Sequence, residues 1–272
     1  MFETLKSVFR DNWAYRGQIS RLALFDLRKQ TSNTMLSWLW LFLKPAAYIF
    51  CFWFALYIGL RSRAAFVDGV EFPYVLWLSA ACIPWFFMSA IIGPGSNVFK
   101  NHAFLVNRVP FPMACIPSIK VVSVFWLQLA FQAILTGIYI GCGYFTGIYM
   151  LQVPLLLLMM FVFWYFVCMM FSVLSALSKD FKNLLGILSM PFFWLSGVIF
   201  NLSNITNPMI LTALYFNPIT FFVTSFRGAY IYRTWFWEDQ PAFAIFMAVF
   251  LLTAIVAMVL LNRFRDDIKD VC

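Results

Sequence analysis

The longest stretch without a charged residue constrains this chain more than any other feature. No Asp, Glu, Lys or Arg occurs between Val121 and Ser178. That stretch is nearly three times the roughly 20 residues that one helix needs to cross a bilayer. It predicts two membrane-spanning helices, separated by the glycine-rich segment Gly141–Gly147. The chain is 63% hydrophobic and 11% charged, whereas a soluble domain carries roughly 25% charged residues, so we expect an all-α polytopic membrane protein.

Shorter apolar runs complete an expected architecture of six spanning helices in one transmembrane domain. Residues 1–34 are amphipathic and basic, which predicts a cytoplasmic helix in the membrane interface, and residues 263–272 predict a cytoplasmic tail. Two apolar runs, Met209–Phe216 and Ile219–Phe226, are too short to cross a bilayer and predict two short re-entrant helices on the outer side. The spans are expected at about residues 35–60, 72–98, 115–142, 150–178, 183–200 and 241–262.

The distribution of basic residues predicts the orientation. Lys and Arg gather in the cytoplasmic loops of membrane proteins. With both termini in the cytoplasm, most of the basic residues fall on the cytoplasmic side. The outer side then holds only Arg61, Arg63, Arg227 and Arg233. We therefore expect a multi-pass plasma-membrane protein with both termini inside.

A half-polar stretch, Asn97–Val122, lies between two of the uncharged runs, and we call it the basic segment. It contains Lys100, Arg108, Lys120 and the only histidine, His102. Its helical spacing predicts a short helix across the gap between spans two and three, and the prolines after Arg108 predict an extended exit. Two interpretations remain open: an ordinary solvated loop, or a docking element for a soluble partner.

Sequence signals for catalysis are missing. No glycine precedes a lysine, so a phosphate-binding loop of the GxxxxGK[ST] type cannot occur. One histidine and widely spaced cysteines argue against a metal site. Lys44 is the only ionisable residue well inside an expected span, and ion-coupled transporters usually keep several. We expect no catalytic site and no cofactor in this chain, and an energy source in another chain that docks on the cytoplasmic face.

Three groups of residues resemble motifs of one family. They are Leu24–Lys29 with Thr34–Trp40 and Lys44-Pro45; Asn107–Pro112 with Pro117; and Ser178–Asp180 with Pro191, Ser196–Phe200, Asn217-Pro218 and Arg227. In this order they are similar to membrane subunits of type-2 ATP-binding-cassette exporters, in the polysaccharide and teichoic-acid branch, with the nearest likeness to wall-teichoic-acid exporter permeases. The chain departs from the family pattern in lacking a Tyr after the basic pair and a Gly before Trp38, and in having Ser-Gly-Val where Ser-Pro-Val is common.

The resemblance implies a homodimer with two copies of an ATPase subunit, which would bind ATP and Mg. It implies export of a lipid-linked cell-wall glycopolymer by a bacterial protein, with membrane lipids around the chain and no nucleic acid as partner. Contact with the ATPase is expected at Lys100, His102, Phe104, Arg108, Lys179 and Asp180. Aromatic faces offer stacking surfaces to sugars, so the expected translocation path contains Trp38, Lys44, Tyr48, Trp53, Tyr57, Trp85, Phe192, Trp194 and Arg227. The aromatic residues would otherwise face lipid or form interface belts.

Three other functions remain open at the level of sequence. A drug or lipid exporter permease would have the same composition. An integral membrane enzyme acting on lipids would need converging polar groups, for which only Arg227, Arg233, Glu238 and Asp239 could serve. An ion-coupled carrier is the third.

Overall fold

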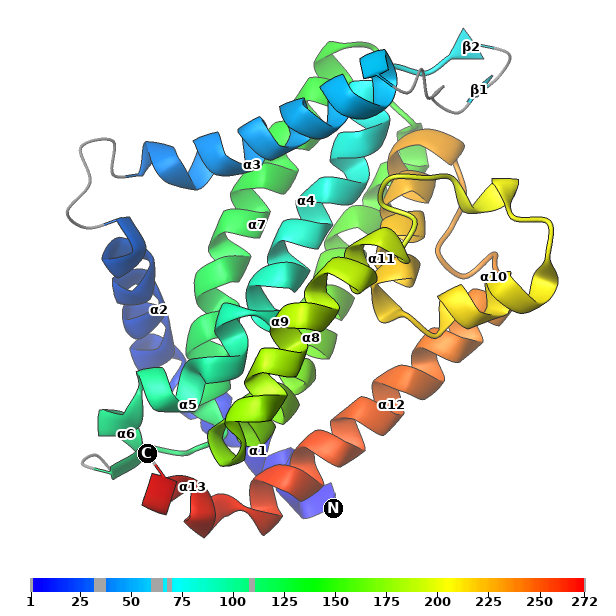
Figure 1. The fold of residues 1–272 in the computed structure, drawn as a ribbon. Helices are drawn as coiled ribbons and strands as arrows, with labels where there is room; N and C mark the ends of the chain where they lie inside the picture. The colour runs from blue at the N-terminus through cyan, green and yellow to red at the C-terminus, as the bar shows by residue number, and fades with distance from the viewer. Residues whose placement is uncertain (1, 32–37, 60–65, 68–69, 108–110, 272) are drawn as a thin grey trace.

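The computed structural model describes residues 2–31, 38–59, 66–67, 70–107 and 111–271. Within these residues, five helices are long and apolar enough to cross a membrane, or six if one bent pair of shorter helices counts as a span. Figure 1 places both chain termini with α1, α5, α6 and α13 at one end of the bundle, which we call the terminal end. The short strands β1 and β2 lie at the opposite end, the far end. The expected all-α multi-span fold is confirmed.

The elements follow one another in the order that the apolar runs predict. They are α1 (Phe2–Ala14), α2 (Arg16–Thr31), α3 (Leu39–Trp53) with the π-helix η1 (Phe54–Gly59), the antiparallel strands β1 (Phe66–Val67) and β2 (Val70–Glu71), α4 (Tyr74–Ile92), η2 (Pro94–Asn97), α5 (Val98–Asn101), α6 (Ala103–Asn107), α7 (Cys115–Gly141), η3 (Gly147–Gln152), α8 (Val153–Leu177), α9 (Lys179–Trp194), η4 (Leu202–Asn204), α10 (Pro208–Tyr215), α11 (Pro218–Arg227), the π-helix η5 (Gly228–Tyr232), α12 (Gln240–Arg263) and α13 (Arg265–Val271).

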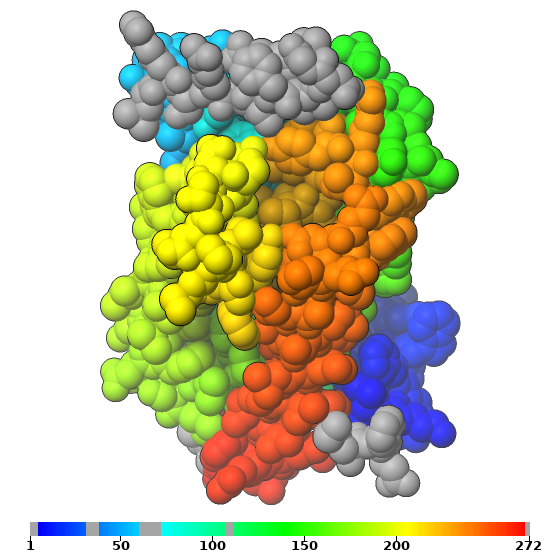
Figure 2. Space-filling view, turned by 90° about the vertical axis from the view of Figure 1, so that its right-hand side faces the viewer, coloured from blue at the N-terminus to red at the C-terminus, as the bar shows by residue number. Residues whose placement is uncertain are grey.

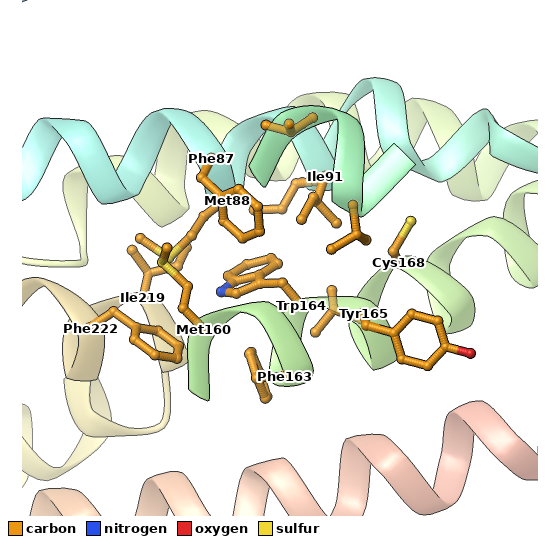
Figure 3. Packing of buried hydrophobic residues seen from close by; sticks show 14 of the residues in the cluster. Phe87, Met88, Ile91, Met160, Phe163, Trp164, Tyr165, Cys168, Ile219 and Phe222 are labelled. Carbon is orange, nitrogen blue, oxygen red and sulfur yellow. The ribbon is translucent and has the colours of Figure 1, made fainter. Parts of the chain in front are cut away.

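The core forms around α8, which packs against α4, α7, α11 and α12. Trp164 of α8 is almost fully buried and lies among the side chains of Figure 3, near Phe87 and Met88 of α4. Phe163 packs against Phe222 and Phe246, at ring-centroid distances of 6.1 and 5.4 Å. The large apolar residues of α4, α8, α11 and α12 therefore hold these helices together.

The amphipathic N-terminal segment is two helices, where the sequence predicts one. The Tyr15 ring packs edge-on against Phe111 at 5.3 Å, at the point where α1 gives way to α2. This change of direction buries both Val8 of α1 and Ile19 of α2. The apolar stripe of α2, which continues through Ala23 and Leu27, packs on α7. The apolar faces of these helices thus cover protein.

Helix α9 differs in its bounds from the span expected over residues 183–200. It begins at Lys179 because the Ser178 side chain caps it, accepting from the Phe181 N–H at 3.4 Å. It ends at Trp194 after 16 residues, which is shorter than the five spanning candidates. The following turn includes Gly197 at φ 74°, where a Cβ atom would collide with Leu202. Residues 195–200 are thus a tight turn, with backbone groups available to other partners.

The two short helices expected between the fifth and sixth spans are α10 and α11. Each begins at an Asn-Pro pair, in which the Asn side chain caps the helix and the proline takes the first position. Asn207 accepts from the Met209 N–H at 2.9 Å, and Asn217 accepts from the Ile219 N–H at 3.1 Å. The bend between α10 and the segment Pro218–Tyr232 is 99°. The two caps explain why the chain turns here.

Candidate functional site

A large cavity lies between α2, α3, the end of α4 and the first half of α7, and we call it the basic cavity. Its volume is about 770 Å³, within the range of small-molecule sites. Three lysines from three different helices line it: Lys29, Lys44 and Lys120. The apolar side chains of Trp40, Leu41, Phe86, Phe87, Leu127 and Phe131 form much of its wall. The cavity therefore combines positive charge with apolar surface.

An ion pair fixes one wall of the basic cavity. Lys120 Nζ lies 3.4 Å from Asp26 Oδ2, and the two side chains are 11% and 21% exposed. The Ser123 hydroxyl donates to the same carboxylate oxygen at 3.3 Å. This pair joins α2 to α7, and breaking a largely buried pair costs far more than breaking a surface pair. The sequence placed Lys120 in the basic segment but gave no signal for its pairing with Asp26.

Lys44 and His102 face the basic cavity with different chemistry. No hydrogen bond or ion pair of the Lys44 ammonium occurs within the described residues, which leaves its three donors to the cavity. His102 Nδ1 donates to the Val98 carbonyl at 3.0 Å. This tautomer leaves Nε2 as an acceptor. Burial lowers the pKa of His102 below its usual value, and this outweighs the opposite effects of the Val98 carbonyl and Asp26.

A second hollow, of about 480 Å³, adjoins the first, and we call it the aromatic groove. It lies between α3, α4 and α9, and Lys44, Pro45 and Phe86 line both hollows. Tyr48 and Trp85, both expected on the translocation path, line it together with Phe193. The structure thus brings three expected path residues, Lys44, Tyr48 and Trp85, to one continuous surface. On α9 it is Phe193, and not its expected neighbour Phe192, that takes part.

A row of stacked aromatic rings continues along α3 toward the far end. Trp53 stacks on Tyr57 at 6.1 Å, Tyr57 on Tyr74 at 5.9 Å, and Tyr74 on Trp77 at 5.4 Å. The Arg227 guanidinium lies over the Trp77 ring, 3.4 Å from its centroid. Three expected path residues, Trp53, Tyr57 and Arg227, therefore belong to one row. The sequence analysis missed Tyr74 and Trp77, whose positions at i and i+3 at the start of a span were the available signal.

Arg227 itself is buried, with 2% of its surface exposed. Its guanidinium donates to the carbonyls of Gly197 at 2.6 Å, Val198 at 2.6 Å and Phe200 at 3.5 Å, all in the turn after α9. Its Nε donates to the Trp77 carbonyl at 3.3 Å. Arg227 therefore joins α11, α4 and this turn, and its four donor contacts end on main-chain oxygen atoms.

Polar side chains of α7 form a row through the interior, which we call the polar row. Gln128 donates to Gln132 at 3.0 Å, and Gln132 donates to the Tyr230 hydroxyl at 2.8 Å. Thr136 lies 2.6 Å from the same hydroxyl. The row begins at Gln128 in the wall of the basic cavity and ends in the π-helix η5. It gives buried polar groups partners at a depth where water is scarce.

The described residues among those expected to contact an ATPase lie at the terminal end. The basic segment is helical as predicted, in the two short helices α5 and α6. Lys100 Nζ donates to the Ser175 carbonyl at 2.9 Å, which joins the segment to the last turn of α8. Phe104 is 51% exposed, and Lys179 and Asp180 are exposed in the first turn of α9. Arg108 lies outside the described residues.

Three expected path residues belong neither to these two hollows nor to the row of stacked rings. Trp38 precedes α3 and is 45% exposed, and Trp194 ends α9 and is 47% exposed. Phe192 is half-buried, and its carbonyl accepts from Asn217 at 3.4 Å. The lining of the two hollows includes none of the three. Their placement is typical of aromatic residues that face lipid or a partner.

The fold and these cavities define a class: a multi-pass membrane protein with a basic, aromatic-walled cavity between its helices. The chain belongs to the ABC-2 type transporter family, which residues 17–231 match. It is similar to the O-antigen export system permease protein RfbA of Myxococcus xanthus, with 22% identity over 225 residues that cover 81% of this chain and 83% of that protein. The resemblance to type-2 exporter permeases is confirmed, and membership of this family makes the chain a transporter permease and not itself a catalytic enzyme.

Proposed function

We propose that this chain is the transmembrane subunit of an ATP-driven exporter that moves a lipid-linked cell-wall glycopolymer, a teichoic acid or a similar polysaccharide, from the cytoplasmic to the outer side. The family and the O-antigen export permease among its relatives support this proposal. The observation that carries it is the basic cavity. A lipid-linked glycan joins an apolar chain to sugars through a phosphate group, so its binding site must offer cations beside apolar surface.

The basic cavity meets that requirement because its lining contains both lysines and apolar side chains. Lys44 offers free donors to a phosphate oxygen. Lys120 is held by Asp26, so it contributes a fixed, partly neutralised charge. Trp40 and Phe131, which line the same cavity, would offer apolar contact to an acyl or prenyl chain. Beyond Lys44, the aromatic groove and the row of stacked aromatic rings would receive the sugars, because moving polar sugars into hydrocarbon costs much free energy.

The proposed assembly contains two copies of this chain and two copies of a separate ATPase subunit that binds ATP and Mg. The terminal end would lie in the cytoplasm, as the excess of basic residues there favours. The exposed α6 residue Phe104 and the first turn of α9 would contact the ATPase. Within the window that qualifies α3 and η1 as a span, only 6% of residues are buried. That exposed helix supports a place for the second copy or for lipid.

Replacement of Lys44 tests the proposed cargo site. In cells that depend on this exporter, Lys44→Gln should lower surface polymer about tenfold, the loss expected for one charge-assisted hydrogen bond. Lys6→Gln is the matched control, because Lys6 is an exposed lysine that lines neither hollow. Surface polymer is measured by chemical assay of whole cells and divided by the membrane content of the chain. Equal export by Lys44→Gln and the wild type would refute the assignment.

Purification tests the assembly separately. The tagged chain, extracted from its host in mild detergent, should bring down an ATPase in about equal amount, as two copies of each would require. The Phe104→Asp variant should lose that partner, whereas Phe9→Asp, which alters another exposed phenylalanine, should keep it. A pure chain that hydrolyses ATP by itself would contradict the proposal.

A further inference from the structure

We propose that a third pocket, at the far-end side of the bundle, binds one sugar unit of the exported polymer, with a preference for neutral or amino sugars over phosphate-bearing units. This inference rests on the proposed function. The pocket lies between α10, α11 and the segment that leads into α12, and we call it the outer pocket. Its volume is about 390 Å³. It opens near the face shown in Figure 2, between the yellow helix α10 and the orange segment before α12.

The lining of the outer pocket suits a sugar ring. A pyranose presents hydroxyl groups around its edge, which both donate and accept, and apolar C–H groups on its faces. Glu238 and Asp239 supply acceptors, and Thr224 supplies a hydroxyl. Phe221, Trp235 and Phe236 supply aromatic surface. Neither the basic cavity nor the aromatic groove contains a carboxylate pair.

The segment that carries these groups is held in place by the neighbouring helices. The Gln152 side chain donates to the Thr234 carbonyl at 2.8 Å and accepts from the Phe236 N–H at 3.0 Å. Trp235 stacks on Trp237 at 4.7 Å. The pocket is thus formed before any ligand arrives, and a preformed site binds more tightly than one that must be ordered.

One contact ties the pocket wall to the start of α12. The Tyr215 hydroxyl donates to Asp239 Oδ2 at 2.6 Å, while Asp239 Oδ1 accepts from the Ala242 N–H at 3.2 Å. Asp239 is therefore both the cap of α12 and a member of the pocket. Its carboxylate has a fixed position, with lone pairs left for a ligand donor.

The charges of the outer pocket determine which units it favours. The carboxylates of Glu238 and Asp239 repel a phosphate diester, while a hydroxyl or a protonated amine can donate to them. Arg227 also lines the pocket, and its four donor contacts already end on main-chain carbonyls. Arg233, on the same segment, is exposed and lies outside the lining. The balance favours neutral and amino sugars.

Saturation-transfer NMR on the full chain, purified with its ATPase partner in lipid nanodiscs, tests this inference. The probes are methyl α-D-glucopyranoside, D-glucosamine and glycerol 3-phosphate at millimolar concentrations. We expect transfer to both sugars and little transfer to glycerol 3-phosphate. Glu238→Gln and Asp239→Asn should each weaken glucosamine binding about tenfold, the effect of losing one charged hydrogen-bond acceptor. Asparagine still caps a helix, so Asp239→Asn keeps α12 intact.

Asp267→Asn is the matched control, because it makes the same carboxylate-to-amide change at an exposed residue of α13 that does not line the pocket. Absence of transfer to both sugars would overturn the inference, as would equal binding by Glu238→Gln and the wild type, or stronger binding of glycerol 3-phosphate. ATP-dependent export is measured on the same variants. Export that persists without sugar binding at this pocket refutes the outer pocket alone, whereas absence of ATP-dependent export by the wild type refutes the proposed function.

Discussion

Replacement of Arg227 by methionine is the perturbation that tests the internal organisation of this protein most directly. Methionine fills a similar volume with an unbranched apolar chain, so the change removes the charge and its donors with little change in packing. The buried guanidinium holds three carbonyls of the turn at residues 197–200 and lies on the Trp77 ring. Without it, that turn loses its link to α11 and α4.

The magnitude follows from the groups left behind. Each of the carbonyls of Gly197, Val198 and Phe200 loses its charged donor, and an unsatisfied buried acceptor costs about 1–3 kcal/mol. Those three add to roughly 3–9 kcal/mol, and the lost cation–π contact adds about 2 kcal/mol. The variant also avoids the cost of burying a charge, which is several kcal/mol. We therefore expect a net loss of about 3 kcal/mol in the free energy of unfolding.

Thermal unfolding in detergent, followed by tryptophan fluorescence, measures this loss. About 3 kcal/mol corresponds to an apparent Tm lower by about 6–12 °C. Limited chymotrypsin digestion provides a local measurement, because Leu195 and Phe200 lie in the released turn. Arg227→Lys should recover little, since one ammonium group cannot reach carbonyls on several sides.

Arg16 provides a matched control on the surface. It makes the same two kinds of contact, a hydrogen bond to the Trp13 carbonyl at 3.0 Å and a position over the Trp13 ring at 4.7 Å, but it is exposed. Arg16→Met should therefore change the apparent Tm by about 1 °C or less, because exposed charged contacts contribute little. If Arg227→Met has the wild-type Tm and the wild-type digestion pattern, the turn is held by other contacts and the argument fails.

Three further predictions concern the basic cavity and the polar row. Asp26→Asn should lower the free energy of unfolding by about 2 kcal/mol. The double variant Asp26→Asn/Lys120→Gln should lose less free energy of unfolding than the two single variants lose together, and a double-mutant cycle on chemical unfolding measures this difference. Burial lowers the pKa of His102 in the folded state, so the folded protein favours the neutral imidazole. The stability that the neutral imidazole contributes is complete above the unfolded pKa of about 6.5. It is lost as the pH falls from there toward the lower pKa of the folded state. The apparent Tm of the wild type should thus fall from about pH 7.5 to about pH 5.5 more than that of His102→Gln, and equal slopes would contradict this. Tyr230→Phe should lower the free energy of unfolding by about 1–3 kcal/mol, because it leaves the Gln132 side chain without its acceptor. Tyr144→Phe, at a half-buried tyrosine outside this row, should lower it by less than about 0.5 kcal/mol, as measured by thermal unfolding.

The spanning helices could be predicted because charge is excluded from the bilayer, so the ends of an uncharged run mark the ends of a span. The run Val121–Ser178 gave two helices whose observed bounds, Cys115–Gly141 and Val153–Leu177, lie close to those expected. The same reasoning failed for residues 183–200. That run is also uncharged, but its last residues form a turn whose carbonyls are satisfied by Arg227, a residue distant in sequence. A hydrophobic run shows where a helix can lie and does not show where a tertiary contact ends it.

The candidate site was predictable in composition but not in geometry. An aromatic residue in a span can face lipid, the core or a cavity, and sequence does not distinguish the three. Lys44 was identifiable because a lysine inside a span is costly. Asp26 was not identified, because an acidic residue on an amphipathic helix is ordinarily solvated, and only the packing of α2 on α7 brings it to Lys120. The residues that the sequence missed are those whose role depends on a partner from another helix.

The strengths of these contacts indicate which part of the molecule moves. Helix α3 is held to the rest largely through ring contacts such as Tyr48 on Phe86 and Tyr57 on Tyr74, each of which contributes about 0.5–1.5 kcal/mol. Helices α4 and α11 and the turn after α9 are joined by Arg227, whose replacement costs about 3 kcal/mol, more than the loss of any one of these ring contacts. A displacement driven from the terminal end would therefore separate α3 from α4 before it separated α4 from α11. Because α3 borders both the basic cavity and the aromatic groove, that displacement would widen the two hollows together, while the outer pocket beside α11 kept its shape.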